Sequence, residues 1–325
     1  MSVVRPLRVL LAGGTTSPHT AQLAGGLVRH GVTVMVLNGP ALVERVRARH
    51  GLDVIPVTYD EIRLRGNARS TAIARLEQWT NERRLRRLLA RHRVDVLHVN
   101  NLYCNERLDR VARLDSLAVP MVVTAWGTDV DDTAVAKRPD YVALRAALLE
   151  RATLITAPSV PMVERCRAFV PHRPADDTRL VRGYIDHRRF HAEAARAGRT
   201  FWVERLGLRP TDLVFFSPRM ARANYQIDRI VRAFAQAFGT DPGADVDGRR
   251  PVLVIANAGS NEEHDEYAQA LQDAAAPLRT RVRFVGPVAD EQVPGFFGMA
   301  DVAVSIPQAD GAPLTHYEMM APVSY

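Results

Sequence analysis

The sequence predicts an α/β protein with parallel sheets, and three observations support this fold class. Short apolar runs rich in β-branched residues alternate with helix-like stretches along the chain. Glycine, proline and polar loops separate these segments. The 325 residues, of which 47% are hydrophobic and 24% charged, suffice for packed cores, and two domains are the natural division of this length. Strands that alternate with helices form strand–helix–strand units with right-handed crossovers.

The first half of the chain holds six of these apolar runs. We expect helices at 20–30, within 58–93 and after Ser159, and strands at 8–12, 32–37, 54–57, 95–100, 121–125 and 154–157. The loop after the first run, GGTTSPH, does not follow G-x-G-x-x-G, and no acidic residue closely follows the second run. A dinucleotide site is therefore disfavoured.

The second half holds four more expected strands. They cover residues 213–216, 252–256, 282–285 and 302–306, with helices expected at 262–275, near 290–299 and at 314–320. The run at 302–306 is β-branched at three of its five positions, which predicts a buried strand.

The loop after this last run has the composition of a phosphate-binding turn. Pro313 supplies a φ suited to a first helical turn, so Asp310 and Gly311 are expected where a strand ends and a helix begins. Such a loop offers unpaired backbone N–H groups and the positive end of a helix dipole. Glu318 follows Asp310 by about two helical turns, so both carboxylates can face one cleft.

The stretch D-G-A-P-L-T-H-Y-E-M-M-A resembles the donor-sugar signature of the retaining glycosyltransferases of the GT-B fold, family 4. That signature is an acidic residue, seven others and then Glu. The resemblance implies that Asp310 contacts a sugar hydroxyl and takes part in catalysis, and that Glu318 contacts the ribose. It also implies that the diphosphate is bound by the N–H groups of the turn Gly311, Ala312, Pro313 and Leu314. An ordinary strand–helix turn with a capping Asp is the alternative.

Arg219 supplies the second part of the implied donor site. The family has an Arg in this loop and a Lys five residues later, both directed at the diphosphate; Arg219 matches the first, and Asn224 replaces the second. The alternative for Arg219 is a surface residue at a strand end. Further along, Asn257-Ala258-Gly259 keeps one glycine of the family's Gly-x-Gly.

Two loops of the first half resemble the acceptor side of the same family. The run S-P-H-T lies in the first loop, and W-G-T-D follows the strand expected at 121–125. The resemblance places Gly14, Thr15, His19, Trp126 and Asp129 at an acceptor cleft. A helix N-terminus is the alternative for the first loop, and a structural turn is the alternative for Asp129.

The resemblance implies two Rossmann-like domains that face each other across a cleft. Asp186 and Phe190 keep the spacing of the family's interdomain segment. We therefore expect an acceptor-side domain at 1–186, a linker at 187–211, and a nucleotide-sugar-binding domain at 212–325. A GT-B second domain normally continues through further strand–helix units, so the resemblance implies that this second domain is incomplete, with 302–306 as an edge strand open to oligomerisation. Pro322 stops the last helix.

The net charge of +7 is carried almost entirely by arginine, with Lys137 as the only lysine. Helix-turn-helix, zinc-ligand and aromatic–basic RNA patterns are not found, so nucleic acid is disfavoured as a partner. The run RRLRRLLARHR at 83–93 predicts a solvated helix face, with a peripheral membrane contact as the alternative.

The sequence predicts a cytoplasmic protein. Cys104 and Cys166 form no disulfide framework or metal pattern, which fits a reduced setting. The first apolar run is too short for a signal peptide, and no apolar stretch reaches the roughly 18 residues of a membrane span. A peripheral position at the inner membrane face stays open.

The function implied by the resemblance is retaining glycosyl transfer from a nucleotide-diphosphate sugar to a hydroxyl acceptor, with no cofactor and no metal. Two alternatives stay open. One is an inactive truncated remnant or partner subunit of a glycosyltransferase, and the other is a sugar-nucleotide epimerase on the same fold.

Overall fold

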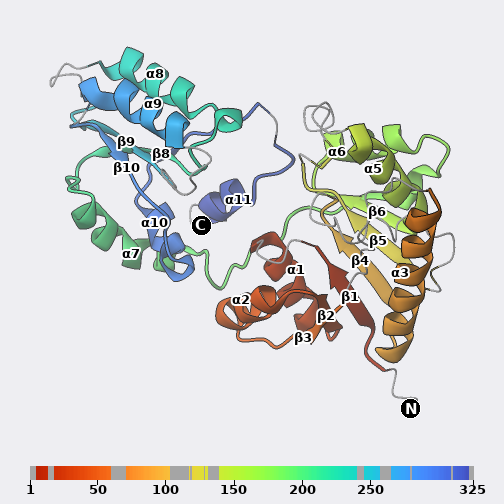
Figure 1. The fold of residues 1–325 in the computed structure, drawn as a ribbon. Helices are drawn as coiled ribbons and strands as arrows, with labels where there is room; N and C mark the ends of the chain where they lie inside the picture. The colour runs from red at the N-terminus through yellow and green to blue at the C-terminus, as the bar shows by residue number, and fades with distance from the viewer. Residues whose placement is uncertain are drawn as a thin grey trace. The chain divides into compact units, whose positions relative to one another are not determined.

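The chain divides into two compact units, Met1–Tyr184 and Ile185–Tyr325 (Figure 1). A computed structural model describes residues 5–13, 18–59, 71–102, 117, 119–127, 129–130, 139–239, 245–256, 265–278, 280–308 and 310–321. Each unit is built on one parallel sheet, which confirms the α/β class.

The first unit has a seven-stranded parallel sheet in the order β3-β2-β1-β4-β5-β6-β7. Its first six strands follow the doubly wound order, with the expected runs in the expected sequence. The strands are β1 (Arg8–Ala12), β2 (Thr33–Leu37), β3 (Ile55–Val57), β4 (Val96–Asn100), β5 (Met121–Thr124), β6 (Leu154–Ala157) and β7 (Thr178–Leu180). The helices are α1 (Pro18–Arg29), α2 (Pro40–His50), α3 (Thr71–Arg91), α5 (Pro139–Arg151) and α6 (Val160–Phe169).

Helices cover both faces of this sheet, which explains why its central strands are apolar on both sides. Leu11 packs with α1 and α2 on one face, whereas Leu10 packs with α3, α5 and α6 on the other. Both leucines are at most 1% exposed. Alternate residues of β1 therefore enter two separate cores.

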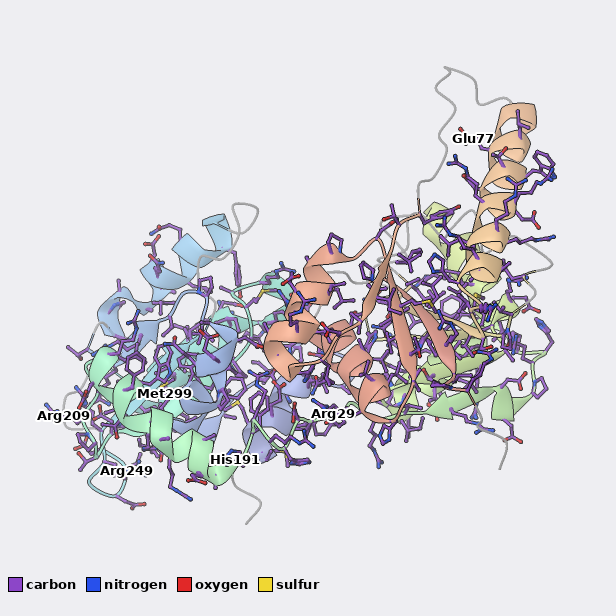
Figure 2. The ribbon with its side chains drawn as sticks, turned by 90° about the horizontal axis from the view of Figure 1, so that it is seen from below. Arg29, Glu77, His191, Arg209, Arg249 and Met299 are labelled. Carbon is purple, nitrogen blue, oxygen red and sulfur yellow. The ribbon has the colours of Figure 1, made fainter. Side chains whose placement is uncertain are left out.

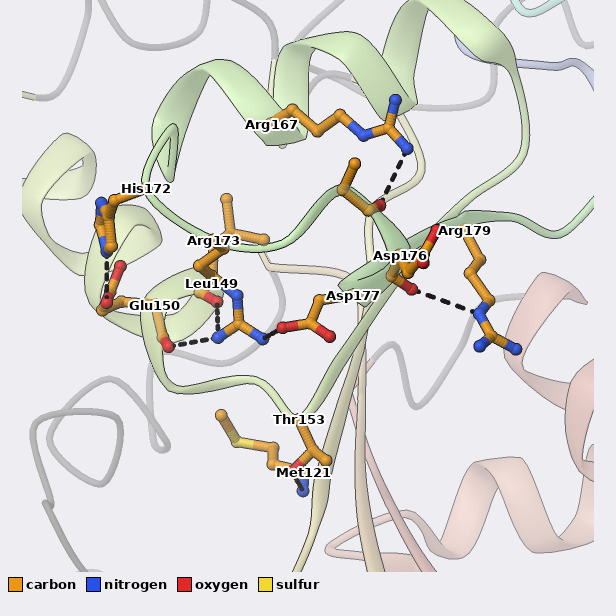
Figure 3. Close-up of polar contacts among 11 residues, drawn as sticks. Met121, Leu149, Glu150, Thr153, Arg167, His172, Arg173, Asp176, Asp177 and Arg179 are labelled. Atoms are coloured by element: carbon orange, nitrogen blue, oxygen red, sulfur yellow. Dashed lines mark hydrogen bonds and ion pairs between the residues drawn. The ribbon is translucent and has the colours of Figure 1, made fainter.

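Arg173 fastens the edge of this unit (Figure 3). Its Nη1 donates to the main-chain oxygen atoms of Leu149 and Glu150 at 3.4 and 2.5 Å, in the last turn of α5. Its Nη2 donates to Asp177 Oδ2 at 3.0 Å, just before β7. A guanidinium at a helix C-terminus satisfies carbonyl groups that have no partner within the helix.

The second unit has a four-stranded parallel sheet in the order β10-β9-β8-β11. Its strands are β8 (Leu213–Ser217), β9 (Pro251–Ile255), β10 (Val282–Phe284) and β11 (Val302–Ala303). Helices α7 and α10 pack on one face, and α8 and α9 pack on the other. The helices are α7 (Ala192–Arg205), α8 (Ile227–Phe238), α9 (Asp265–Ala275), α10 (Val293–Gly298) and α11 (Leu314–Met320).

Two arginines form ion pairs at the N-terminal ends of the strands in this unit. Arg250 Nη2 donates to Asp212 Oδ2 at 2.7 Å, and Arg249 Nη2 donates to Asp301 Oδ2 at 2.8 Å. Arg249 is labelled in Figure 2, as is Met299, which is fully buried in the core beneath α7 and α10. These ion pairs join the segments that enter β8, β9 and β11.

The prediction of a buried strand at 302–306 is wrong. Only Val302 and Ala303 form β11, and both are exposed, as is Ile306 at 42%. The reason is position: β11 pairs with β8 on one side and is the edge of the sheet among the described strands. The expected edge position is confirmed, and oligomerisation through this edge stays a prediction.

Residues 187–211, expected as the linker, include helix α7. Trp202 of this helix is 3% exposed and packs against Phe296 of α10, with ring centroids 4.5 Å apart. Among the described helices, none is both long and apolar enough to cross a membrane.

Two glycines set the distance between α7 and α10. A Cβ atom added to Gly198 would lie 2.4 Å from Gly295 Cα, and one added to Gly295 would lie 2.5 Å from Gly198 Cα. Both neighbours are backbone atoms, which cannot rotate away. The two helices can therefore approach this closely only with glycine at both positions.

Gly198→Ala should destabilise the protein by about 1–3 kcal/mol, because the helices must separate to accommodate the methyl group. Gly26→Ala is the matched control: this glycine also lies within a helix, α1, and its Cβ would meet no atom within 4 Å. That control should leave stability unchanged or raise it by up to about 1 kcal/mol. Urea unfolding of both variants measures the difference, and equal stability would contradict the close packing.

A partly buried polar chain joins the neighbouring strands β4, β5 and β6, and it leads to a prediction about pH. His98 Nε2 lies 2.7 Å from Thr124 Oγ1, which lies 2.7 Å from Thr156 Oγ1. Burial lowers the pKa of His98 to about 4. Because the unfolded chain takes up this proton near pH 6.5 and the folded protein only near pH 4, stability should fall as the pH drops through that interval.

The loss attributable to His98 should be roughly 3 kcal/mol between pH 7 and pH 4. Urea unfolding at several pH values tests this, with NMR titration of the imidazole as the direct readout. His98→Gln should remove this part of the pH dependence, whereas His30→Gln, at an exposed position, should retain it. An imidazole that titrates near pH 6.5 in the folded protein would refute the assignment.

Candidate functional site

The sheet of the second unit brings Arg219 and Asp310 together. Arg219 follows the carboxyl end of β8, and Asp310 follows that of its neighbour β11. In parallel sheets, these ends lie on the same side, where ligands of open α/β sheets bind. Arg219 Nη2 donates to Asp310 Oδ2 at 2.6 Å, and each side chain is only 16% exposed.

Tyr225 and two loop contacts support this pair. The Arg219 guanidinium carbon lies 4.2 Å from the centroid of the Tyr225 ring, within the range of a cation–π interaction. Gln308 N donates to Asn224 O at 2.8 Å, and Gln226 Nε2 donates to Ile306 O at 2.7 Å. Asn224, which stands where the family has Lys, thus uses its main chain to join the loops after β8 and β11.

His316 of α11 belongs to the same group and was missed by sequence reasoning. Burial lowers its pKa, and the positive charge of Arg219 lowers it further, while the Asp310 carboxylate opposes both effects. Its Nε2 is buried without a hydrogen-bond partner among the described residues. The site therefore holds a neutral imidazole beside an ion pair. Its place inside the signature stretch, six residues after Asp310, was the available signal.

The turn before α11 differs from the expected set of donors. Pro313 has no N–H group, so the expected diphosphate contacts of residues 311–314 reduce to Gly311, Ala312 and Leu314. Leu314 is 4% exposed and Glu318 is 9% exposed. The ribose contact of Glu318 stays a prediction.

In the first unit, His19 and Trp126 come together at the carboxyl side of the strands. Their rings are stacked, with centroids 5.0 Å apart and an interplanar angle of 27°. Trp126 Nε1 donates to Asn100 Oδ1 at 2.8 Å, and Asn100 Nδ2 donates to Thr20 Oγ1 at 2.9 Å. The first turn of α1, the end of β4 and the loop after β5 thus bring together one aromatic and polar group. The expected cleft residues Gly14 and Thr15 lie outside the described residues, as do Asn257-Ala258-Gly259.

Asp129 holds its own loop together. Its carboxylate accepts from the backbone N–H groups of Trp126 at 3.0 Å, Gly127 at 2.8 Å and Leu102 at 3.2 Å. Burial raises the pKa of Asp129, and these hydrogen bonds oppose the rise. The side chain is 2% exposed. This geometry is that of a structural turn, and the acceptor contact of Asp129 stays a prediction.

Among the described residues, no three His, Cys, Asp or Glu side chains are grouped so that they could hold a metal ion. A guanidinium, a carboxylate and a neutral imidazole lie together at the ends of β8 and β11. Such a set can bind an anionic leaving group next to hydroxyl groups.

Comparisons with solved structures show that the chain has the GT-B fold, with two Rossmann-like domains. The chain is similar to HepE of Anabaena, solved in complex with UDP and glucose, with a TM-score of 0.69 and 13% identity over 97% of this chain and 78% of that one. It is also similar to sucrose-phosphate synthase of Thermosynechococcus elongatus, with a TM-score of 0.66 and 16% identity over 97% and 79%. A trehalose-phosphate synthase of Burkholderia vietnamiensis gives 0.65 and 12% over 97% and 81%.

No curated protein matches the sequence. The model of one protein family does match, over residues 14–183, and its description is a glycosyl transferase 4-like domain. The match covers more than half of the chain. It includes every described strand and helix of the first unit except β1. The chain therefore belongs to the glycosyl transferase 4-like family.

Proposed function

We propose that this chain transfers a sugar from a nucleotide-diphosphate donor to a hydroxyl acceptor, with retention of the anomeric configuration. The observation that carries the proposal is the Arg219–Asp310 ion pair at the carboxyl ends of β8 and β11. Membership of the glycosyl transferase 4-like family supports it. Because the similar HepE structures contain UDP and UDP-glucose, a UDP-sugar is the first donor to test.

The division of labour follows the two units. The second unit takes the donor, since Arg219, Asp310 and His316 lie there. The first unit takes the acceptor, and its stacked His19 and Trp126 supply an apolar face of the kind that sugar rings pack against. The loop that holds Trp126 is fixed by Asp129, so Asp129 acts on the acceptor through this positioning.

Arg219 stabilises the leaving group as the glycosidic bond loosens and negative charge collects on the diphosphate. Without donor, Asp310 neutralises the guanidinium at 2.6 Å. Donor binding replaces this contact. The guanidinium then donates to the diphosphate oxygens, and the sugar hydroxyls donate to the carboxylate of Asp310. The neutral His316, with its unsatisfied Nε2, adds a hydrogen bond without adding charge.

Arg219→Gln should lower kcat/KM roughly 30- to 1000-fold, because it removes about 2–4 kcal/mol of transition-state stabilisation. The assay follows transfer from labelled UDP-sugars to hydroxyl acceptors. Arg229→Gln removes an equal charge from an exposed site on α8 and should leave the rate unchanged. If Arg219→Gln transfers sugar as fast as the unsubstituted chain, the role of Arg219 is wrong.

Two further measurements separate the alternatives. Calorimetry with UDP should show micromolar binding if the donor site is functional, whereas an inactive remnant or partner subunit would show none. Asn224, which stands in place of the family's Lys, is the feature that favours this alternative. An epimerase would consume the donor without acceptor. NMR of the product anomeric proton shows directly whether configuration is retained.

A further inference from the structure

Helix α3 carries three arginines on one stripe that the proposed transfer reaction does not use. Arg84, Arg87 and Arg91 are spaced by three and four residues, so their side chains lie above one another, and all three are exposed. Leu85 and Leu89, on a different side of the same helix, are at most 4% exposed and pack into the core. The stripe therefore borders the apolar contact between α3 and the sheet.

The other arginines of this helix segment have partners. Arg86 pairs with Glu82 one turn away, and the Arg83 guanidinium carbon lies 4.8 Å from the centroid of the Trp79 ring. By contrast, Arg87 and Arg91 have no ion pair or hydrogen bond with the described residues. Like charges four residues apart on a helix repel by a few tenths of a kcal/mol. An anion placed between them would remove that repulsion.

A cavity lies beside this stripe. It has a volume of about 270 Å³ and is lined by the three arginines together with Thr58, Tyr59, Leu88 and His92. None of the described residues that line it is acidic. We call it the basic pocket.

The wall of the basic pocket opposite α3 is fixed. Tyr59 N donates to Asn38 Oδ1 and Asn38 Nδ2 donates to Tyr59 O, both at 2.7 Å. The phenol of Tyr59, 3% exposed, donates to Asn81 O of α3 at 3.2 Å. Thr58, which precedes it, is exposed and brings a hydroxyl to the rim. A fixed wall lowers the entropic cost of binding a small ligand.

We propose that the basic pocket binds a phosphate group, held by Arg87 and Arg91 with Thr58 as a further donor. Guanidinium groups suit phosphate because their planar N–H pairs match two phosphate oxygens at once. The volume lies at or below the lower end of pockets for drug-sized ligands, so it fits a phosphomonoester or diphosphate rather than a whole nucleotide sugar. The phosphate can come from a soluble phosphorylated compound or from the headgroup of an anionic lipid.

Inorganic pyrophosphate tests the site by calorimetry. The reference protein carries Arg219→Gln, so that the proposed donor site does not contribute to binding. Adding Arg87→Gln and Arg91→Gln should weaken pyrophosphate binding at least tenfold. The matched control adds Arg83→Gln and Arg86→Gln, which remove the same charge from the same helix, and should change binding less than threefold. Circular dichroism of both proteins checks that α3 remains folded.

Vesicles separate the two sources of phosphate. The same proteins are sedimented with phosphatidylcholine vesicles with and without phosphatidic acid. Binding to the acidic vesicles that is lost with Arg87 and Arg91 but kept in the control assigns the pocket to a lipid headgroup. Pyrophosphate binding without vesicle binding assigns it to a soluble compound. If neither probe binds, or if binding is equal with and without Arg87 and Arg91, the proposal is overturned.

Discussion

The pairing of β11 with β8 is the constraint on which the candidate donor site depends. Only two residues of β11 are paired, Val302 with Phe215 and Ala303 with Phe216, and β11 has no second neighbour among the described strands. This short ladder nevertheless sets the point where the chain leaves the sheet, and hence where Asp310 meets Arg219. The hydrogen bond between the main chains of Gln308 and Asn224, 2.8 Å long, continues the connection beyond the sheet. The donor loops are therefore held together by polar contacts where the strand itself is too short to do so.

The Arg219–Asp310 pair sits in an environment where charge is only partly screened. Each side chain is 16% exposed, so the attraction exceeds that of a surface pair, and the desolvation cost is smaller than in a core. The pair also keeps the site ready for an anion, because Asp310 neutralises the guanidinium until a phosphate takes its place. His316 adds no charge to this balance, since burial and the nearby guanidinium both lower its pKa. A protonated His316 would add a positive charge that repels the Arg219 guanidinium.

Sequence reasoning succeeded where local pattern and burial agree. The runs that became β1, β2 and β9 are apolar because helices cover both faces of each sheet, and this is visible without coordinates. It failed at edges and in arginine-rich segments. Strand β7, with Arg179 and Leu180 exposed, has no apolar run to detect, and the apolar run at 302–306 proved mostly exposed.

Helix α2 was not predicted although Pro40 starts it and Gly51, with φ of 62°, ends it. The close approach of Gly198 in helix α7 to a residue nearly 100 positions away is not visible in the sequence, because the two segments are distant along the chain.

The residues of the candidate site also fall into those that the sequence could predict and those that it could not. Asp310 and Arg219 could be proposed from motif spacing, because each stands at a fixed distance from the end of a strand, and parallel strands deliver their ends to one side. The surroundings of His316 and Asp129 could not. Burial lowers the pKa of His316, and Arg219, which comes from another loop, lowers it further. Asp129 accepts a hydrogen bond from Leu102, 27 residues earlier, as well as from its own loop. The basic pocket follows the same logic, because the arginine run was evident but the facing Thr58 and Tyr59 were not. A motif thus identifies the groups that one segment can place, and the function of each group depends on which distant segment packs against it.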